Sequence, residues 1–509
     1  MPKFDTLNPN DWRMAKVRKW TGDIPKVVYT HVLLIGVPTI FYYCLRVGGM
    51  PLIRIHMAIA AFFLLSSLII FLEATNALFR RFAVKNKRPD ANRFARFKQS
   101  AKSALGVGGN NSKPPMKPLP RCSFLVAAYL PNEQDIILDT LKHILKTVQR
   151  STDGLEVILA YNTPVDLSVE DDLRRLALAY PELRLLRVEG SHSKAENLNA
   201  ALHIVTGEIT CILDADHLPA ADCFVRAWRW LEHDYDVVQG RNIIRNHRHS
   251  LLTLNIAIEF ETLYGVSHAA KSFLTDSSIF GGSNGYWRTE VLQQIRFNPA
   301  MLTEDIDASM RTLLSGYRIL HDRSIVTTEL APADFNSFWF QRKRWAQGWL
   351  EVSFKYQRRV WKSVHFTLWQ KIYWTYLLYF CVLYSLIALQ ILPLLLSLFL
   401  YQGDLPASEN PFLWFSTVVT FSSGIYQTLV TMKVAAVRYP LFYFLQHAVT
   451  IFLYTILKNM IAVVGLYDHL HGHNKWVVTP RGIKQKRRTV AVRKAPVLAP
   501  SAAGVGSVK

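Results

Sequence analysis

The sequence predicts an α/β domain, with a parallel-rich mixed sheet and helices, that is inserted between transmembrane and interfacial helices. Long apolar runs lie toward both ends of the 509-residue chain, whereas residues 121–332 are mixed in character and carry many charged side chains. Within this middle part, short apolar or β-branched runs alternate with amphipathic helical patterns. That alternation is typical of strands and helices that build a mostly parallel sheet.

An N-terminal segment, residues 1–82, contains two apolar runs at about 27–45 and 55–72. Each run is just long enough to cross a hydrocarbon layer of ~30 Å, so the pair predicts a transmembrane hairpin. Lys and Arg flank both sides of the hairpin, which places its ends and the middle domain in the cytosol. We expect the first run to stay as an anchor, because no cleavage site of the usual form follows it.

Residues 83–120 are rich in Ser, Gly, Asn, Lys and Pro and predict a flexible basic linker. The strand and helix repeat follows it. Predicted strands cover residues 124–129, 155–161, 183–188 and 209–213, and predicted helices cover 132–148, 170–180, 194–205 and 220–233. Ligands of such sheets bind at the carboxyl ends of the strands, so the residues directly after each strand are the candidates for chemistry.

The net charge of +21 raises the question of nucleic-acid binding. However, Lys and Arg gather beside the apolar runs, at 80–121 and 475–494, as is typical of the cytosolic flanks of membrane spans. We therefore predict membrane lipids, and no nucleic acid, as partners. The five cysteines have neither metal-site nor disulfide spacing, which fits a reducing cytosol.

The C-terminal part contains further apolar helices. Residues 333–370 predict interfacial helices, and residues 371–432 predict two transmembrane helices, at about 376–400 and 412–432. A third apolar stretch, within 433–474, includes His447 and Lys458. If it also crossed, the basic C-terminus would lie outside, against the positive-inside rule. We therefore predict that it is interfacial or re-entrant, and that four helices span the membrane.

Two carboxylates, Asp214 and Asp216, follow the fourth predicted strand with one residue between them. Carboxylates at a strand end suit Mg²⁺ or Mn²⁺ shared with a diphosphate. The pair alone also fits a solvated loop, but its position directly after the strand favours a site. Lys194 opens a helix, where backbone N–H groups also attract an anion; an ordinary surface lysine is the alternative.

A further pair of acidic residues, Glu304 and Asp305, comes after a glycine-rich loop at 281–285. Glycines permit the close approach of a sugar. One carboxylate that takes a proton from an acceptor hydroxyl is what inverting glycosyl transfer requires. The alternative is that these carboxylates merely stabilise the N-terminus of a helix.

Residues 341–349 combine polar and aromatic side chains. Gln341, Arg344 and Trp345 are spaced i, i+3 and i+4, so they share one helical face that suits a charged ligand. The surrounding sequence, from Phe335 to Phe354, is aromatic and apolar nearly all round, which suits a helix lying at a membrane surface.

Taken in order, these motifs resemble the signature of processive, membrane-embedded family 2 glycosyltransferases, which include cellulose, curdlan, chitin and hyaluronan synthases. The resemblance covers about residues 120–350 and rests on Lys194-Ala-Glu-Asn197, Asp214-Ala-Asp216, Thr303-Glu304-Asp305 and Gln341-x-x-Arg344-Trp345. It implies a GT-A-like fold for residues 121–332, a UDP-sugar donor and a growing polysaccharide as acceptor.

The resemblance also implies roles for single residues. Asp216 would bind the metal, Asp214 and Lys194 would contact the nucleotide, and Asp305 would be the general base. On the diphosphate and acceptor sides the implied residues are Gln341 and Arg344 for the diphosphate, and Trp345, Gly281, Gly282 and Glu304 for the acceptor.

Two places depart from the family pattern. The motif after the first strand is Tyr129-Leu-Pro-Asn-Glu133, and the aspartate expected after the second strand is replaced by a run that contains Asn162. We assign uracil contacts to Tyr129, Glu133 and Asn162. Residues 475–488 resemble the gating loop of cellulose synthases, with Thr479 and Arg481 closing on the diphosphate; a β-turn beside a basic tail is the alternative. Residues 489–509 predict a disordered tail.

The leading hypothesis is a processive inverting transferase of the plasma membrane. It would polymerise a β-linked polysaccharide from a UDP-sugar at the cytosolic face and pass it through its own channel. A non-processive transferase acting on a membrane lipid is the alternative within enzymes, and a transporter or scaffold with a degenerate domain is the alternative outside them. The sequence leaves the sugar and the formation of a homo-oligomer open.

Overall fold

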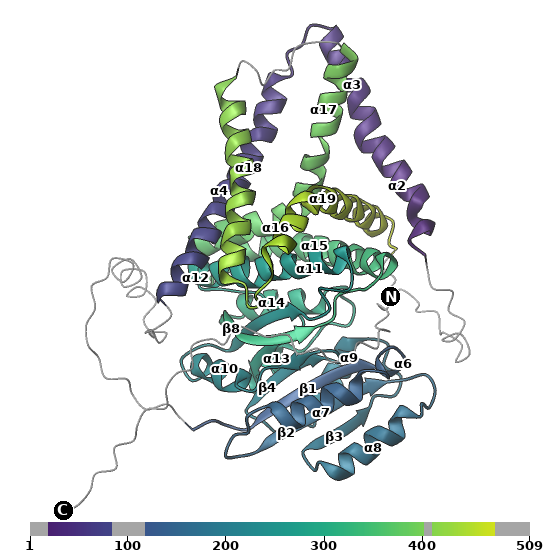
Figure 1. Cartoon of the computed structure of the whole chain (residues 1–509), viewed down its shortest axis with the longest axis vertical. Helices are drawn as coiled ribbons and strands as arrows, with labels where there is room; N and C mark the ends of the chain where they lie inside the picture. Colours follow the sequence, from purple (N-terminus) through teal and green to yellow (C-terminus); the bar gives the residue numbers. More distant parts are fainter. Residues whose placement is uncertain (1–18, 84–117, 402–409, 474–509) are drawn as a thin grey trace, which may run out of the picture.

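The computed structural model describes residues 19–83, 118–401 and 410–473. In Figure 1 a sheet with helices on both faces forms the lower part, and a column of long helices rises from it. Most of the predicted linker at 83–120, the gating-loop-like segment at 475–488 and the predicted tail at 489–509 lie outside the described residues.

The sheet has eight strands in the order β3-β2-β1-β4-β7-β6-β8-β5. Its strands are β1 (Cys122–Tyr129), β2 (Leu155–Asn162), β3 (Leu183–Arg187), β4 (Ile209–Asp214), β5 (Leu218–Pro219), β6 (Val237–Ile244), β7 (Gly285–Arg288) and β8 (Ile319–Glu329). Strands β1 to β4 are parallel, β7 runs antiparallel between β4 and β6, and β8 is parallel to β6. The predicted parallel-rich mixed sheet is therefore confirmed.

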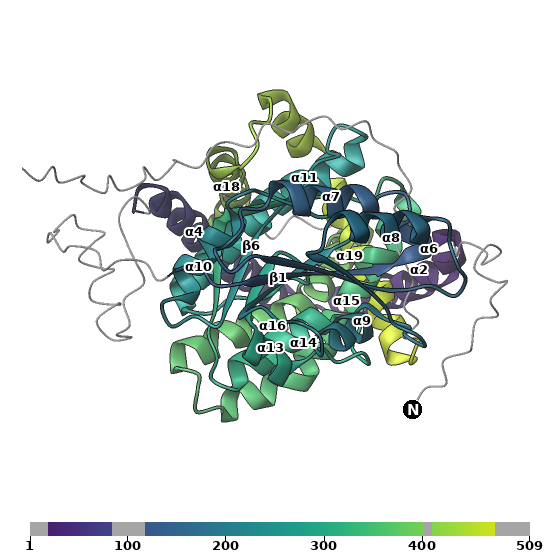
Figure 2. The same ribbon diagram turned by 90° about the horizontal axis from the view of Figure 1, so that it is seen from below.

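Both faces of the sheet are covered, which explains why its central strands β1 and β4 are buried and largely apolar. Phe124 and Val126 of β1 point into a core with α7 (Ile137–Thr147), α8 (Val169–Ala179) and α10 (Cys223–Leu231). Leu125 and Ala127 point to the other face, toward helices α9 (Lys194–Ala201), α13 (Thr289–Ile295) and α14 (Glu304–Leu314). Figure 2 shows the sheet between these two layers.

The predicted helix at 132–148 is divided in the structure. A single turn, α6 (Leu130–Glu133), contains Pro131 in its first turn, and α7 begins only at Ile137. Proline is favoured at a helix start, so it shifts the first turn toward Leu130. The change matters for the site, because α6 begins directly after β1.

The N-terminal hairpin consists of η1 (Trp20–Asp23), α2 (Ile24–His31), the π-helix η2 (Val32–Gly36), α3 (Val37–Val47) and α4 (Ile53–Ala83). The π-helix precedes Pro38, which has no N–H to donate to the carbonyl of Leu34. Gln390 donates from Nε2 to that carbonyl at 3.4 Å. A side chain from a distant helix therefore satisfies the backbone group that the proline leaves open.

The later helices are α11 (Leu251–Thr262), the π-helix η3 (Leu263–Ser267), α12 (His268–Thr275), α15 (Phe335–Lys362), α16 (Leu368–Leu389), α17 (Ile391–Tyr401), α18 (Pro411–Val434) and α19 (Leu441–Leu470). The predicted span at 376–400 is broken at Gln390, just before Pro393 removes a backbone donor. In Figure 1, α2, α3, α4, α17 and α18 stand upright, whereas α19 lies across the base of the column near α11 and α15.

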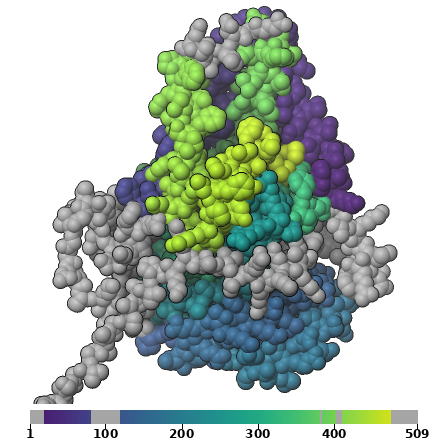
Figure 3. Space-filling view, in the orientation of Figure 1, coloured from purple at the N-terminus to yellow at the C-terminus, as the bar shows by residue number. Residues whose placement is uncertain are grey.

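Within the part of the chain that the structure describes, four helical stretches are long and apolar enough to cross a membrane: Trp20–Val47, Ile53–Phe79, Leu383–Tyr401 and Leu441–Leu470. Helix α18 is not in this set, yet it stands along α4, where Ser416 donates to the carbonyl of Ala60 at 2.8 Å. Both α18 and α19 expose large apolar side chains, and Figure 3 shows them on one face of the column.

Helix α15 is tied to elements from both ends of the chain. The Nζ of buried Lys343 lies 2.6 Å from Asp23 and 2.7 Å from Asp468, and Lys26 also pairs with Asp468. A buried charge is tolerated only when it is paired in this way. The network therefore joins α15 to the start of the N-terminal hairpin and to the end of α19.

Helix α15 also lies directly against the loop before α14. A Cβ added at Gly348 would come within 2.3 Å of Cγ2 of Thr303, closer than real contacts allow. One turn earlier, Arg344 donates from Nη1 to the carbonyl of Leu302 at 3.0 Å. The glycine therefore sets how closely α15 approaches the acidic residues that begin α14.

We predict that Gly348→Ala lowers the free energy of unfolding by about 1–3 kcal/mol through overpacking. It should also reduce, about tenfold or more, any activity that depends on the acidic residues of α14, because small displacements of catalytic groups are costly. Gly424→Ala is the matched control, since nothing lies within 4 Å of the added Cβ there. Thermal unfolding and activity of the two variants measure both effects, and a wild-type rate for Gly348→Ala would contradict the argument.

Candidate active site

The sequence-predicted site residues that the structure describes come from two regions. One lies at the carboxyl ends of β1, β2 and β4, together with the loop at 281–285 that precedes β7. The other consists of the N-terminus of α14 and one face of α15. Lys194 connects them, because it pairs with Asp214 and also lies in the electrostatic field of Asp305.

Lys194 is the central cation of the site. It begins α9, whose N-cap Ser193 accepts from the backbone N–H of Glu196 at 3.2 Å. Its Nζ pairs with Asp214 and donates to the carbonyl of Gly282 at 2.7 Å. Although burial lowers the pKa of Lys194, the carboxylates around it raise that pKa on balance. The ammonium is therefore charged and is held at the meeting point of β4 and the glycine-rich loop.

The two aspartates after β4 have different surroundings. The side chain of Asp214 is 24% exposed, while that of Asp216 is 1% exposed. Asp216 accepts from the backbone N–H of Leu330 at 3.0 Å and lies 3.0 Å from Nδ1 of His217. Asp214 therefore faces the open side of the site, and Asp216 is fixed from behind.

His217 bridges two acidic side chains. Its Nε2 lies 2.7 Å from Glu329, and its Nδ1 faces Asp216. Burial alone would lower the pKa of His217, but Glu329 and Asp216 raise it to about 9. Both ring nitrogens of His217 therefore face carboxylates, so the imidazole orients these side chains.

The chemistry of the cluster fits a hard divalent cation. Potential ligand atoms of Asp214, Asp216 and His217 lie within 4.8 Å of one another. Two carboxylates supply the oxygen ligands that Mg²⁺ and Mn²⁺ prefer, and such ions keep positions for phosphate oxygens. Asp214 and Asp216 are the residues that would hold it, because both ring nitrogens of His217 already face carboxylates.

Asp305 has the pKa expected of a general base. Burial and the adjacent Glu304 raise the pKa of Asp305 to about 7, while Lys194 and Arg344 act in the opposite direction. Its Oδ1 accepts from the backbone N–H of Ile306 at 2.9 Å. A carboxylate with a pKa near neutrality can take up a proton and release it again under physiological conditions.

The loop at 281–285 approaches Asp305 closely. Gly282 has φ of +85°, and a Cβ there would lie 2.8 Å from Oδ2 of Asp305. A Cβ at Gly281 would lie 2.9 Å from the hydroxyl of Tyr264. The two glycines therefore allow the loop to pack closely against Asp305 and Tyr264.

Tyr264 is a site residue that sequence reasoning missed. It lies on the π-helix η3, a feature often found at functional sites. Burial, followed by the carboxylates of Glu329, Asp305 and Asp214, raises the pKa of Tyr264 well above its usual value. The neutral hydroxyl therefore faces the same space as the acidic groups. Nothing in the sequence pattern signals the π-helix that directs it there.

An aromatic row connects the base with α15. The rings of Tyr264 and Phe260 are 5.7 Å apart, and those of Phe260 and Trp345 are 6.5 Å apart. Trp345 is half-buried. Gln341 lies one turn before Trp345 on α15 and is also half-buried.

The residues assigned to uracil gather at the ends of β1 and β2. Tyr129 and Asn162 are register partners, and Glu133 lies on α6 directly after β1. Asn162 accepts from Nδ2 of Asn197 at 2.8 Å, and Asn197 lies one turn after Lys194 on α9. Helix α9 thus links Asn162, which the sequence predicts to contact uracil, with Lys194, which it predicts to contact the nucleotide.

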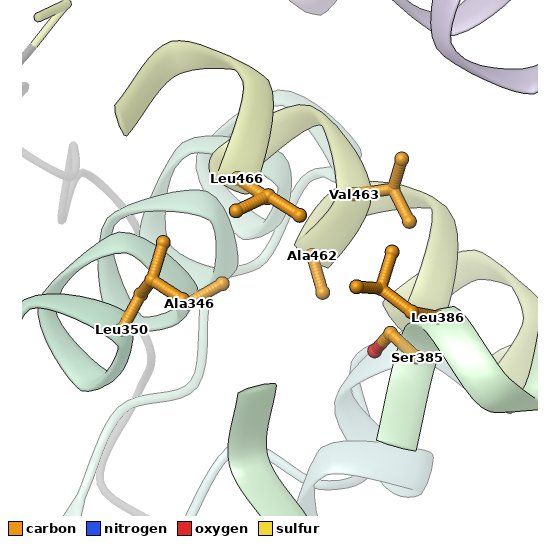
Figure 4. A pocket seen from close by; sticks show the side chains of 7 residues that line it. All are labelled: Ala346, Leu350, Ser385, Leu386, Ala462, Val463 and Leu466. Carbon is orange, nitrogen blue, oxygen red and sulfur yellow. The ribbon is translucent and has the colours of Figure 1, made fainter. Parts of the chain in front are cut away.

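A small cavity lies on the side of α15 that carries Ala346 and Leu350 (Figure 4). It encloses about 20 Å³ between α15, α16 and α19, roughly the space of one water molecule. Ala346, next to Trp345, lines it together with Ser385 and Leu386 of α16. As it stands, this cavity is too small for a sugar ring.

Thr479 and Arg481 lie outside the described residues. The described chain approaches α15 just before them, since Gln347 donates from Nε2 to the carbonyl of His473 at 3.1 Å.

Comparison with known families identifies the middle of the chain. The profile of "Glycosyltransferase like family 2" matches residues 120–348, which include all the carboxylates above and the Gln341 to Trp345 motif. Residues 120–348 form a family 2 glycosyltransferase domain. The mixed sheet is accordingly a GT-A-like one, and the resemblance drawn from the motifs is confirmed.

Relatives of this glycosyltransferase domain include polysaccharide synthases. The chain is 26% identical to cellulose synthase 1 catalytic subunit of Komagataeibacter xylinus, over 43% of this chain and 31% of that protein. It is 28% identical to poly-beta-1,6-N-acetyl-D-glucosamine synthase of Staphylococcus aureus, over 45% of this chain and 55% of that protein. It is 26% identical to the probable glycosyltransferase YdaM of Bacillus subtilis, over 52% of this chain and 64% of that protein. The matches thus span less than two thirds of each relative.

Among solved structures, the chain overlaps with the mannosyltransferase PcManGT of Pyrobaculum calidifontis, described in complex with GDP-Man and Mn²⁺. The TM-score is 0.47 at 22% identity, and the overlap covers 78% of this chain and 98% of that chain.

We predict a pH dependence for this glycosyltransferase that Glu304 modulates. Asp305 must be ionised to act as a base, so activity should rise as the pH increases through about 7. Because Glu304 raises the pKa of Asp305, Glu304→Gln should move this rise to lower pH. The measurement is the rate of donor turnover across about two pH units on each side of neutrality. An unchanged midpoint would show that Glu304 does not control the base.

Proposed function

We propose that the protein is a processive inverting glycosyltransferase that polymerises a β-linked polysaccharide from a UDP-sugar. The observation that carries the proposal is the placement of Asp305. One carboxylate with a pKa raised to about 7 lies between the cation Lys194 and the face of α15 that bears Arg344 and Trp345. Inversion needs one such base on the acceptor hydroxyl, opposite the leaving diphosphate.

The donor would bind with its nucleotide over the ends of β1 and β2. Tyr129, Glu133 and Asn162 would contact uracil there. Lys194 would neutralise the diphosphate, with Gln341 and Arg344 facing it from α15. Arg344 suits a two-pronged hydrogen bond to phosphate, because its guanidinium is planar and always charged.

Mg²⁺ or Mn²⁺ held by Asp216 and Asp214 would neutralise charge on the leaving diphosphate. The chain's own residues prepare that position, because His217 and the backbone N–H of Leu330 fix Asp216 in place. Lys194 keeps Asp214 oriented from the opposite side.

The acceptor would lie along the aromatic row. Its terminal sugar would stack on Trp345, with Gly281, Gly282 and Glu304 around the reacting hydroxyl. Asp305 takes the proton of that hydroxyl as the oxygen attacks the donor sugar. An aromatic platform binds the apolar face of any sugar in the chain, so it suits repeated addition followed by a shift of the product.

The membrane arrangement that fits this chemistry has four spans, formed by α2–α3, α4, α16–α17 and α18. Helix α19 would be interfacial: it lies across the base of the column (Figure 1), and its Lys458 and His447 bond to α11 of the glycosyltransferase domain. Passage of a polymer would require α16 and α19 to part at the small cavity beside Ala346. The sheet domain would lie in the cytosol at the plasma membrane, with lipids around the exposed apolar helices.

The segment at 475–488 would close over the bound donor, with Thr479 and Arg481 on its diphosphate. This follows from its likeness to a gating loop and from the anchoring of His473 on α15.

The relatives named above include a UDP-forming cellulose synthase subunit and an N-acetyl-D-glucosamine polymer synthase, so UDP-glucose and UDP-N-acetylglucosamine are the donors to test first.

The proposal is tested by incubating the purified protein in lipid with each UDP-sugar and Mg²⁺ or Mn²⁺. We expect UDP release together with a polymer that linkage-specific hydrolases digest. Asp305→Asn should abolish both while UDP-sugar still binds. Trp345→Ala should abolish polymer but leave donor binding intact, because stacking serves the acceptor alone.

Other outcomes are informative. Transfer of a single sugar to a lipid would replace the proposal by the non-processive alternative. If the wild-type protein gave no more product than Asp305→Asn with any donor, enzymatic activity of this kind would be contradicted.

A further inference from the structure

We propose that Glu259 is a positioning residue for the acceptor site, acting through Arg342 to fix the ring of Trp345. The inference rests on the proposed function for its meaning, but the geometry that carries it does not depend on the substrate. Arg342 lies between the motif positions Gln341 and Arg344, and Glu259 lies on α11, a helix outside the motifs.

Arg342 is stacked against Trp345. Its guanidinium carbon lies 4.4 Å from the centre of that ring and 5.3 Å from the ring of Phe338, one turn before it on α15. A guanidinium at this distance attracts an aromatic face, more strongly when it is shielded from water. The side chain of Arg342 is only 10% exposed. Arg342 therefore covers one face of Trp345 and restrains the ring.

Arg342 is itself held by Glu259. Its Nη2 donates to Oε2 of Glu259 at 2.6 Å, a charge-assisted hydrogen bond. Glu259 lies on α11, one residue before Phe260 and five before Tyr264. The same helical segment thus carries the anchor of Arg342 and the aromatic row that leads to the base.

Glu259 is also bound from α19. Lys458 donates from Nζ to its Oε1 at 2.8 Å, and the hydroxyl of Tyr454 donates to its Oε2 at 2.6 Å. Burial alone would raise the pKa of Glu259, but Arg342 and Lys458 lower it to about 2. Glu259 is therefore ionised at every pH at which the protein would work, and it joins three helices around one charge.

This arrangement does more than stabilise the fold. A partly buried indole could rotate about its side-chain bonds, whereas a planar cation held by a fixed carboxylate restricts it to one orientation. Neutralising Glu259 would release Arg342 and, with it, the ring. The consequence should appear at the acceptor and not at the donor, because Lys194 bonds to Asp214 and Gly282 and Arg344 bonds to Leu302, and none of these partners belongs to this network.

The first test follows Trp345 itself. The chain has 13 tryptophans, so fluorotryptophan is incorporated and the resonance of Trp345 is assigned by its loss in Trp345→Phe. Glu259→Gln and Arg342→Gln should both shift or broaden this resonance in the full-length protein. Arg342→Lys should do the same, since lysine keeps the charge but not the planar stack.

A matched control exists elsewhere in the domain. Arg318 pairs with Asp276 at 2.8 Å and lies 4.2 Å over the ring of Tyr235, which is the same kind of stack at a somewhat more exposed place. Asp276→Asn should leave the Trp345 resonance unchanged. An equal effect from Asp276→Asn would attribute the change to general loosening and overturn the inference.

The second test is kinetic. Glu259→Gln should raise the KM for a soluble oligosaccharide acceptor about tenfold or more and shorten the product, with the KM for the donor unchanged. In a Trp345→Ala background the same substitution should add nothing to the acceptor defect. An independent, additive effect would overturn the inference.

The two tests separate the inference from the proposed function. If the wild-type protein makes no polymer but the Trp345 resonance still moves as expected, the proposed function fails and the positioning role stands. If the resonance does not move in Glu259→Gln, the positioning role is wrong, whatever polymer the protein makes.

Discussion

The close packing of α15 against the loop before α14 is the constraint on which the site depends. Gly348 has no side chain to hold Thr303 away, and Arg344 bonds to the carbonyl of Leu302 at 3.0 Å. The two contacts bring the arginine of one motif beside the base of another, although some forty residues separate them in sequence. If α15 packed less closely against this loop, Arg344 would lie farther from Asp305. The predicted diphosphate contact and the predicted base would then be too far apart to act together.

Charge balance then defines what each acidic residue can do. Asp216 is buried and fixed by His217, Asp214 faces Lys194, and Asp305 is left with burial and Glu304 raising its pKa to about 7. Three carboxylates in one site would repel one another without the cations between them. The same surroundings therefore keep two carboxylates suited to a metal and one suited to a proton.

The first four strands of the sheet could be predicted, because each leaves a local pattern in the sequence. Strands β1, β2 and β4 are largely apolar runs, and Asp214 and Lys194, both predicted to contact the nucleotide, pair in the structure. The remaining strands were not predicted, because β7 has only four residues and the β6–β8 pairing contains a register shift. The π-helix that directs Tyr264, and Glu259 on α11, depend on contacts between distant helices, which no local pattern reveals.

The account's central claim is that one base, Asp305, drives a single displacement at the donor sugar. The most direct measurement is the anomeric configuration of the first bond formed, followed by proton NMR with an α-linked UDP-sugar and a short acceptor. The account predicts a β-linked product at the earliest time observed. An α-linked product would contradict it, because retention requires a mechanism other than a single displacement assisted by Asp305.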